Sequence, residues 1–261
     1  MMTSDKSVCK VEAAYEKLKS LVLANQLRPN EHLQINSLAD RLRVGVTPLR
    51  EALIRLTAEK LIESHPHRGF FAKVLTIAEL DDLSQFAHLL LRSSLGVGVH
   101  RFDNERPAAD MCGTKDLAQH HQSAEAGARA VEQLYERIVM ASENAQMLQA
   151  IRNYNSRVHA VLLIFVEQFE TPEVTSGYVL AVTDLLAAGD RDTVLRMLRQ
   201  WFDTKATCFP GLIREATVQA FSARPSNESL VPPHSVRTER VSTPQMSAAI
   251  APQKIRLYSP E

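Results

Sequence analysis

Apolar residues recur at helical spacing along most of this chain. Residues 10–26 are the first example. One face of this predicted helix is apolar and the other carries lysines: Val11, Tyr15, Leu18, Leu21 and Val22 against Lys10, Lys17 and Lys19. Asn25, Pro29 and Asn30 end the pattern. The spacing therefore predicts an amphipathic helix that packs on a core.

Two shorter helices follow within residues 36–58. Asn36 and Ser37 are predicted to cap a helix that runs through Arg43. Gly45 is predicted to form the turn, and Thr47 to cap the next helix with Pro48 at its first position. The buried faces are predicted to be Leu38, Ala39 and Leu42 in the first helix and Leu49, Ala52, Leu53 and Leu56 in the second.

Alternating residues then predict two strands, 61–64 and 70–74, joined by a basic loop at 65–69. Two short helices followed by a basic hairpin are typical of a winged helix-turn-helix. Such a domain places one helix in the DNA major groove and a loop beside it. The first 75 residues therefore predict a DNA-binding domain.

From Thr76 onward the pattern is helical. Thr76 and Glu79 resemble a capping box before a helix that reaches about Val99. Residues 101–116 read as a loop, and further helices are predicted at 117–142, 145–169, 173–188 and 190–220. The predicted fold is mostly α, an N-terminal winged helix-turn-helix (1–75) plus a C-terminal all-helical bundle (76–221). Residues 222–261 hold half of the prolines and predict a disordered tail.

Charge is divided unevenly between these parts. Net charge is zero over the 261 residues, but residues 1–75 carry 12 Lys+Arg against 8 Asp+Glu, and the remainder carries 18 against 22. A basic end on an acidic body suits a protein that binds phosphate through one domain only.

Other classes of protein find little support. The sequence has no phosphate-cradling Gly-rich loop, no Gly-x-Ser-x-Gly and no His-Glu-x-x-His, so we expect no enzyme. No apolar run has the length of a membrane span, and the first residues lack a signal peptide's apolar core. Cys9, Cys112 and Cys208 are odd in number and widely spaced, which favours reduced thiols and a cytoplasmic location.

The segment Thr47-Pro-Leu-Arg-Glu-Ala-Leu53, the later Glu59-Lys-Leu-Ile62 and the wing Arg68-Gly69 resemble the GntR family of bacterial transcription factors. This resemblance covers about 65 residues. The helical second part resembles the FadR-like branch with an FCD-type ligand-binding domain, through its helix count, Asn144 after a helix and Ala188-Gly-Asp190 before the last one. The resemblance implies a homodimer that binds operator DNA.

The residues expected to contact DNA come from both the helices and the wing. Thr47 can offer its hydroxyl and N–H to a phosphate, and Arg50, one turn on, can reach a guanine edge or a phosphate. For Arg41, Arg43 and Arg55 a solvated helix face is the alternative reading. The predicted DNA-contact set is Asn36, Arg41, Val46, Thr47, Arg50, His67, Arg68 and Gly69.

One departure from the family pattern concerns the base-reading position. The family usually has Ser-Arg before Thr-Pro, whereas this sequence has Gly45-Val46. The valine side chain cannot donate a hydrogen bond, and a lost bidentate guanine contact costs about 1–3 kcal/mol of discrimination. The resemblance therefore implies a different operator, with Val46 against a thymine methyl, or weakened specific binding.

The FCD resemblance also raises the question of a metal. Many FCD domains bind one through an Asp and three His, but the matching positions here are Val131 or Glu132, Tyr135, Val179 and Gln200. Without converging imidazoles we expect no metal and no cofactor. A metal-free bundle can still bind a small effector, namely an organic or aromatic acid or an acyl thioester. Its predicted polar lining is Tyr135, Asn144, Arg152, His159 and Gln200.

These features favour a ligand-responsive, homodimeric repressor of a catabolic operon. The alternative is a non-enzymatic interaction protein that keeps the fold but has weakened specific DNA binding, as Gly45-Val46 would permit.

Overall fold

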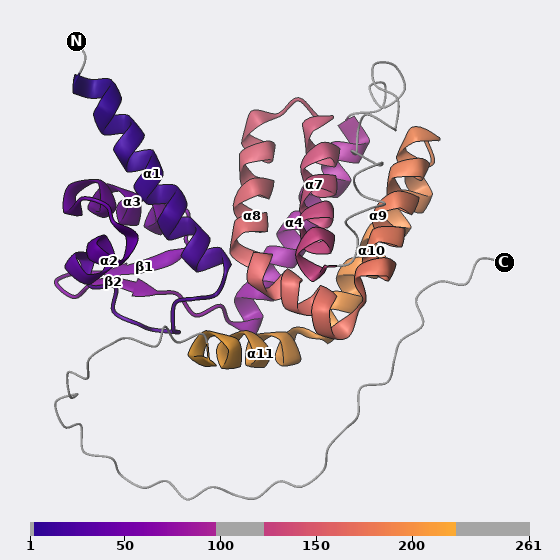
Figure 1. The fold of residues 1–261 in the computed structure, drawn as a ribbon. Coiled ribbons are helices and arrows are strands. Elements are labelled where there is room, and N and C mark those ends of the chain that lie inside the picture. Colours follow the sequence, from indigo (N-terminus) through magenta and orange to yellow (C-terminus); the bar gives the residue numbers. More distant parts are fainter. Residues whose placement is uncertain (1–2, 98–122, 223–261) are drawn as a thin grey trace, which may run out of the picture. The chain divides into compact units, whose positions relative to one another are not determined.

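The computed structural model describes residues 3–97 and 123–222 (Figure 1). In chain order its elements are α1 (Thr3–Leu23), α2 (Ile35–Leu42), α3 (Val46–Ala58), β1 (Ile62–His65), β2 (Gly69–Ala72), α4 (Ile77–Val97), α7 (Ala124–Met140), α8 (Ala145–Ile164), η1 (Phe165–Phe169), α9 (Pro172–Ala187), α10 (Arg191–Thr207) and α11 (Phe209–Ser222). The predicted mostly α fold is confirmed, with one small hairpin near the N-terminus.

Residues up to Val74, termed the head below, form a core of their own. α1 packs along α3, and buried leucines and alanines of α1, α2 and α3 meet between them. Tyr15 ties this packing together: its hydroxyl hydrogen-bonds the Glu59 carboxylate at 2.9 Å, and the Arg55 guanidinium lies 3.6 Å from its ring centroid. The apolar stripe seen in the sequence is therefore the side of α1 that covers α3.

The hairpin completes the head. β1 and β2 pair antiparallel, from Ile62 opposite Ala72 to His65 opposite Gly69. A third segment joins them, because the Leu33 N–H donates to the Phe70 carbonyl and the Ala72 N–H to the Glu31 carbonyl. This arrangement is the winged helix-turn-helix that the pattern predicted.

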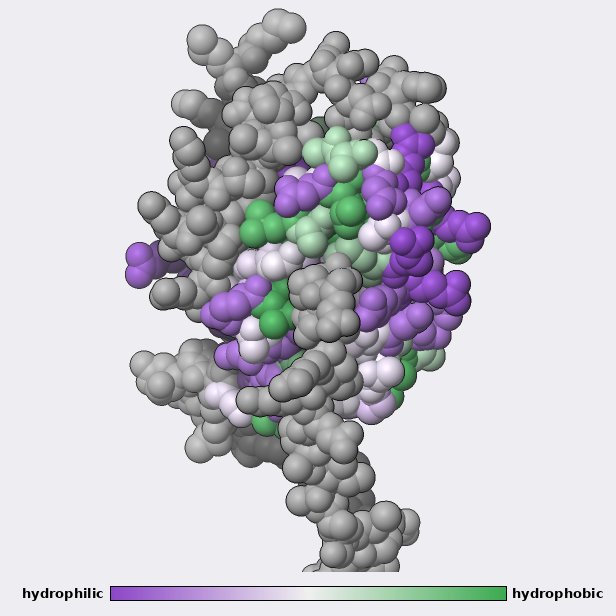
Figure 2. All heavy atoms as spheres, turned by 90° about the vertical axis from the view of Figure 1, so that its right-hand side faces the viewer, coloured by the Kyte–Doolittle hydropathy of each residue, from purple (hydrophilic) through white to green (hydrophobic). Residues whose placement is uncertain are grey.

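The later helices surround a second apolar core, which we term the bundle. α7 packs against α8, α9 and α4, and α10 packs against α4 and α9. α8 runs into η1, a short π-helical segment, before the chain turns at Glu170 into α9. On the side of the molecule that carries α9 and α10, hydrophobic residues lie beside hydrophilic ones (Figure 2). No helix in the described ranges is both long and apolar enough to cross a bilayer.

Both predicted caps in the head were wrong. α2 begins at Ile35 after Gln34, with Asn36 already inside the first turn, and α3 begins at Val46 after Gly45. Thr47 and Pro48 are therefore the second and third residues of α3, and neither cap residue makes a side-chain hydrogen bond. Extended Gly45 lets the helix begin before the threonine. By contrast, the Thr76 hydroxyl accepts from the Glu79 N–H at 3.1 Å, as the capping-box pattern indicated.

The helix predicted at 190–220 was also wrong, because it is two helices that meet at Cys208. Pro210 in the first turn of α11 is the signal that the apolar spacing obscured. The predicted loop at 101–116, the tail at 222–261 beyond Ser222, and Cys112 lie outside the described residues.

Candidate nucleic-acid interface

The N-terminus of α3 presents backbone donors to solvent. Leu49 is the first residue whose N–H donates into the helix, to the Gly45 carbonyl. Pro48 has no N–H, which leaves the N–H groups of Val46 and Thr47 without an intrahelical partner. The helix dipole adds positive potential at this end, and helix N-termini of this kind bind phosphate.

An exposed stripe continues along α3 from this end. Val46, Arg50 and Ile54 are four residues apart and hence share one face, with Thr47 beside them. All four are exposed; Val46 retains 42% and Ile54 57% of its surface. The opposite face, which includes Leu49 and Leu53, is fully buried. Sequence reasoning missed Ile54, although its spacing from Arg50 is the signal that would have found it.

The remaining arginines and Asn36 divide into two groups. Asn36 and Arg41 are exposed on α2, and Arg43 follows it in the left-handed conformation, with φ 53°. Arg55 instead pairs with Glu12 at 2.8 Å and with Glu59 at 3.4 Å. Arg55 is therefore occupied within the head, whereas the other three remain accessible to a nucleic acid.

The wing exposes the predicted basic tip. His67 and Arg68 are exposed in the turn between the strands, and the Arg68 guanidinium lies 5.3 Å from the Phe71 ring centroid. Gly69 has φ +90°, and a Cβ there would approach the His32 Nε2 to 3.0 Å. Only glycine fits both the conformation and the close approach, so Gly69 fixes the direction in which the tip points.

The five predicted effector residues do not converge on one site. Asn144 caps α8, its Oδ1 accepting from the N–H groups of Gln146 and Met147, and Gln200 is exposed on α10. Tyr135 is buried among aromatic rings, stacked on Phe202 with centroids 5.7 Å apart.

Arg152 and His159 are the two predicted effector residues that share a cavity, of about 230 Å³. His159 Nδ1 lies 2.7 Å from Glu132 Oε1, and Arg152 Nε lies 2.8 Å from Glu136 Oε2. The hydrogen bond with Glu132 raises the pKa of His159 above its ordinary value, against the opposing effect of burial. Arg152 and His159 therefore already have partners, whereas Asn155, which also lines this cavity, has a buried Oδ1 without one.

The interior of the bundle holds polar groups that sequence reasoning missed. Lys205 is 2% exposed, and its Nζ donates to the Tyr154 hydroxyl at 3.0 Å. Nearby, the Tyr178 hydroxyl is buried without a hydrogen-bond partner. The buried Tyr135 hydroxyl and Trp201 Nε1 have no partner elsewhere among the described residues, and Trp201 acts as a donor toward Tyr135, which lowers the Tyr135 pKa against the larger effect of burial. Burial raises the pKa of both tyrosines, so these hydroxyls stay protonated and can donate. No motif marks these residues in the sequence, because they lie on different helices.

Metal-ligating side chains do not gather anywhere in residues 3–97 and 123–222: no group of three His, Cys, Asp or Glu lies in a position to hold an ion. The positions that the FCD resemblance matched to metal ligands include apolar Val131 and Val179, both buried.

Among known proteins, a family model matches the head of this chain. Residues 10–72 match the family model described as bacterial regulatory proteins, gntR family. The Nta operon transcriptional regulator of Aminobacter aminovorans is 28% identical over 204 residues, which cover 75% of this chain and 94% of that protein. The HTH-type transcriptional regulator McbR of Escherichia coli (strain K12) is 25% identical over 134 residues, 51% of each chain.

Solved structures share the fold over most of the chain. A transcriptional regulator GntR from Rhodococcus sp. RHA1 superposes with a TM-score of 0.63 and 18% identity, covering 78% of this chain and 98% of that one. McbR/YncC of E. coli superposes with a TM-score of 0.52 and 17% identity, covering 82% and 97%. The combination of a winged head and an all-helical second part therefore occurs in other regulators.

Proposed function

We propose that this DNA-binding transcriptional regulator, whose residues 10–72 form a winged helix-turn-helix of the gntR type, is a cytoplasmic, homodimeric repressor released by a small-molecule effector. The second part is proposed to be a divergent FCD-type domain of the FadR-like branch. The observation that carries the DNA-binding half of the proposal is the exposed N-terminus of α3.

In this proposal α3 lies in the major groove. The free N–H groups of Val46 and Thr47 hold a phosphate, and Arg50 reaches a base edge or the neighbouring phosphate. Val46 and Ile54 present methyl groups where a thymine methyl can pack. Asn36, Arg41 and the wing tip at His67 and Arg68 contact the flanking backbone. The target is therefore proposed to differ from that of relatives with Arg at the Val46 position.

A dimer would double this modest reading surface across two half-sites. α4 offers apolar surface for it: Phe86 and Leu89 are three residues apart and are 46% and 60% exposed. A Leu89→Glu variant should therefore be monomeric in light scattering. If it stays dimeric, the dimer contact lies elsewhere.

The effector is proposed to enter the bundle, where Tyr135, Tyr178 and Trp201 present buried polar groups and Lys205 offers a positive charge. An organic or aromatic acid, or an acyl thioester, would supply acceptors and an apolar body. Arg152 and His159 are proposed to line the approach. Trp201 is the chain's single tryptophan, so its emission reports directly on binding. Titration with a catabolite panel should quench or shift this emission, and no change across the panel would remove the effector proposal.

Selection from a random DNA pool tests the DNA-binding proposal. The wild-type protein should enrich a two-fold symmetric sequence, and Arg50→Ala should reduce its affinity about tenfold or more. Arg129→Ala is the matched control, because Arg129 is an exposed arginine of α7 outside the head.

Enrichment that survives Arg50→Ala would show that α3 is not the reading helix. Retention of DNA that depends only on salt, with no enriched sequence, would favour an interaction protein that has lost specific reading.

A further inference from the structure

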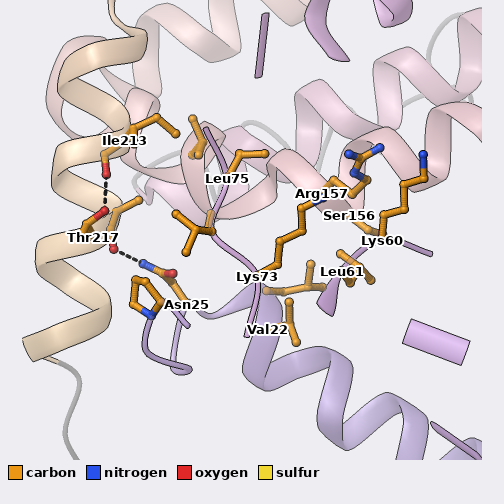
Figure 3. A pocket seen from close by; sticks show the side chains of 16 residues that line it. Val22, Asn25, Lys60, Leu61, Lys73, Leu75, Ser156, Arg157, Ile213 and Thr217 are labelled. Atoms are coloured by element: carbon orange, nitrogen blue, oxygen red, sulfur yellow. Dashed lines mark hydrogen bonds between the residues drawn. The ribbon is translucent and has the colours of Figure 1, made fainter. Parts of the chain in front are cut away.

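A second cavity lies between the head and the bundle (Figure 3). Its volume is about 110 Å³. The head contributes the end of α1 and the segments on either side of the hairpin, and the bundle contributes α8 and α11. The Asn25 side chain bridges the two parts by donating to the Ala216 carbonyl at 2.6 Å. The cavity is therefore built from both parts of the described chain.

The charge of its lining is one-sided. Lys60, Lys73 and Arg157 line the cavity, and none of its lining residues is acidic. Figure 3 shows the three basic side chains together on one side of the cavity, away from Asn25 and Thr217. Three positive charges in a small space repel one another unless an anion lies among them.

One carboxylate lies behind this cluster and does not neutralise it. Glu79 Oε1 pairs with both Lys73 Nζ, at 2.5 Å, and the Arg157 guanidinium. Two cations therefore share a single carboxylate, and Lys60 has no ion-pair partner among the described residues. The buried Arg157 Nε also has no hydrogen-bond partner. The cluster thus retains positive charge and an unused donor.

The rest of the lining limits what can fill the space. Val22, Leu61, Leu75, Val161 and Ile213 give an apolar wall, and Ser156 adds a hydroxyl. A space of about 110 Å³ holds several waters or one small organic molecule. A short ligand with concentrated negative charge and a small apolar portion fits both the size and the lining.

We propose that this cavity is a second ligand site that binds a small dianion, either a phosphate ester or a short dicarboxylate, between the head and the bundle. Lys60, Lys73 and Arg157 bind its charge, and the apolar wall takes its carbon atoms. The site is separate from the effector site proposed inside the bundle. Because the ligand contacts both parts at once, its binding couples to their relative position.

Calorimetric titration of the full-length protein with inorganic phosphate and with succinate tests the site directly. One saturable site is expected, at which the two anions compete. Lys60→Gln should weaken binding about tenfold, the effect of losing one charge-assisted contact, and Lys60→Arg should restore it. Lys60 is exposed, so neither change should disturb the fold.

Two further variants distinguish a specific binding site from a general effect of positive charge. Arg199→Gln removes one exposed positive charge on α10, outside the cavity, and should leave binding unchanged. Glu79→Gln should tighten binding, because it releases Lys73 and Arg157 from their shared carboxylate. If this variant does not fold, the Lys60 pair of variants decides the question.

The proposal is overturned if neither anion binds, if Lys60→Gln leaves binding unchanged, or if Arg199→Gln weakens it as much as Lys60→Gln. Preference between phosphate and succinate identifies which source of negative charge the site takes. None of these readouts requires DNA, so failure of the repressor proposal would leave this result intact. A shift of DNA affinity on adding the preferred anion, absent in Lys60→Gln, would add that the site is regulatory.

Discussion

The head and the bundle differ in where they place their polar groups. Every buried polar or charged residue among those described lies in the bundle, from Ser84 to Lys205, and so does every buried polar side-chain atom that lacks a partner. The head buries leucines, alanines and one anchored tyrosine, and it keeps its unsatisfied donors at the exposed start of α3. The head is thus a rigid support for an outward surface, whereas the bundle keeps hydrogen-bonding capacity inside.

This difference suits two kinds of binding. A DNA backbone meets exposed donors at little desolvation cost. The apolar core of the head is therefore needed only to hold α3 in place. A small ligand must leave water completely, and it then requires buried partners. Variants that change one part and spare the other test this separation.

Removing core volume from the head should weaken DNA binding more than it changes the stability of the bundle. Leu53 is fully buried in α3, and Leu53→Ala should destabilise the head by about 3 kcal/mol. DNA affinity should fall in gel-shift assays, while the urea transition reported by Trp201 stays near its wild-type midpoint. Leu198→Ala, in the bundle core, should instead move that transition. If Leu53→Ala moves it equally, the two cores unfold as one unit.

Replacing the buried lysine should improve stability while removing a function. Lys205→Met keeps the length of the side chain but removes a buried charge without a described carboxylate partner, so we expect about 1–2 kcal/mol of stabilisation. The same variant should lose the effector response of Trp201. Exposed Lys10→Met serves as the control and should change neither. A loss of stability in Lys205→Met would mean that Lys205 has a structural role.

Replacing each of two glycines by alanine should change the stability of the protein in opposite directions. Gly69→Ala forces an L side chain into φ +90° and against His32, and should cost about 1 kcal/mol and weaken DNA binding through the wing. Gly177→Ala lies within α9 with open space around it, and should stabilise the bundle by about 0.5 kcal/mol. Thermal unfolding of both variants measures the pair. Equal signs would contradict the assignment of Gly69 as a conformational requirement.

The smallest expected effect is a pH dependence confined to the bundle. The hydrogen bond with Glu132 raises the pKa of His159 in the folded state. Its contribution to stability is therefore complete below the ordinary histidine pKa of 6.5, and is lost as pH rises through the higher folded value. His159→Gln should make the midpoint of unfolding less dependent on pH over this range. The DNA affinity of the protein should not change over the same pH range. If it does, the bundle and the head are coupled through His159.

The fold was predictable because each head element carries its own local signal. Apolar spacing in α1 and α3, alternation in the hairpin and the glycine at 69 all concern neighbours in sequence. The caps at 36 and 47 were predicted wrongly because the hydroxyl and amide residues there looked better than Gln34 and Gly45, whose extended backbones begin the helices instead. The helix break at Cys208 was missed since apolar spacing continues through it.

The sites inside and beside the bundle were far less predictable. Lys60, Lys73 and Arg157 are separated by as many as 97 positions, and no spacing rule joins them. The same holds for Tyr135, Tyr178 and Lys205. Asn144 and Gln200 were predicted as polar lining of an effector site, but Asn144 caps α8 and Gln200 is exposed. Whether either residue touches an effector stays a prediction. Tertiary packing, which the sequence pattern does not report, decides these groups.

The uncapped start of α3 has a consequence for how such a regulator can change over generations. In the proposed interface, the phosphate is held by the backbone N–H groups at positions 46 and 47, which every residue except proline supplies. A mutation at Val46 therefore alters base preference while leaving the anchor in place. Drift at this position can move the protein from one operator to another through intermediates that still bind DNA.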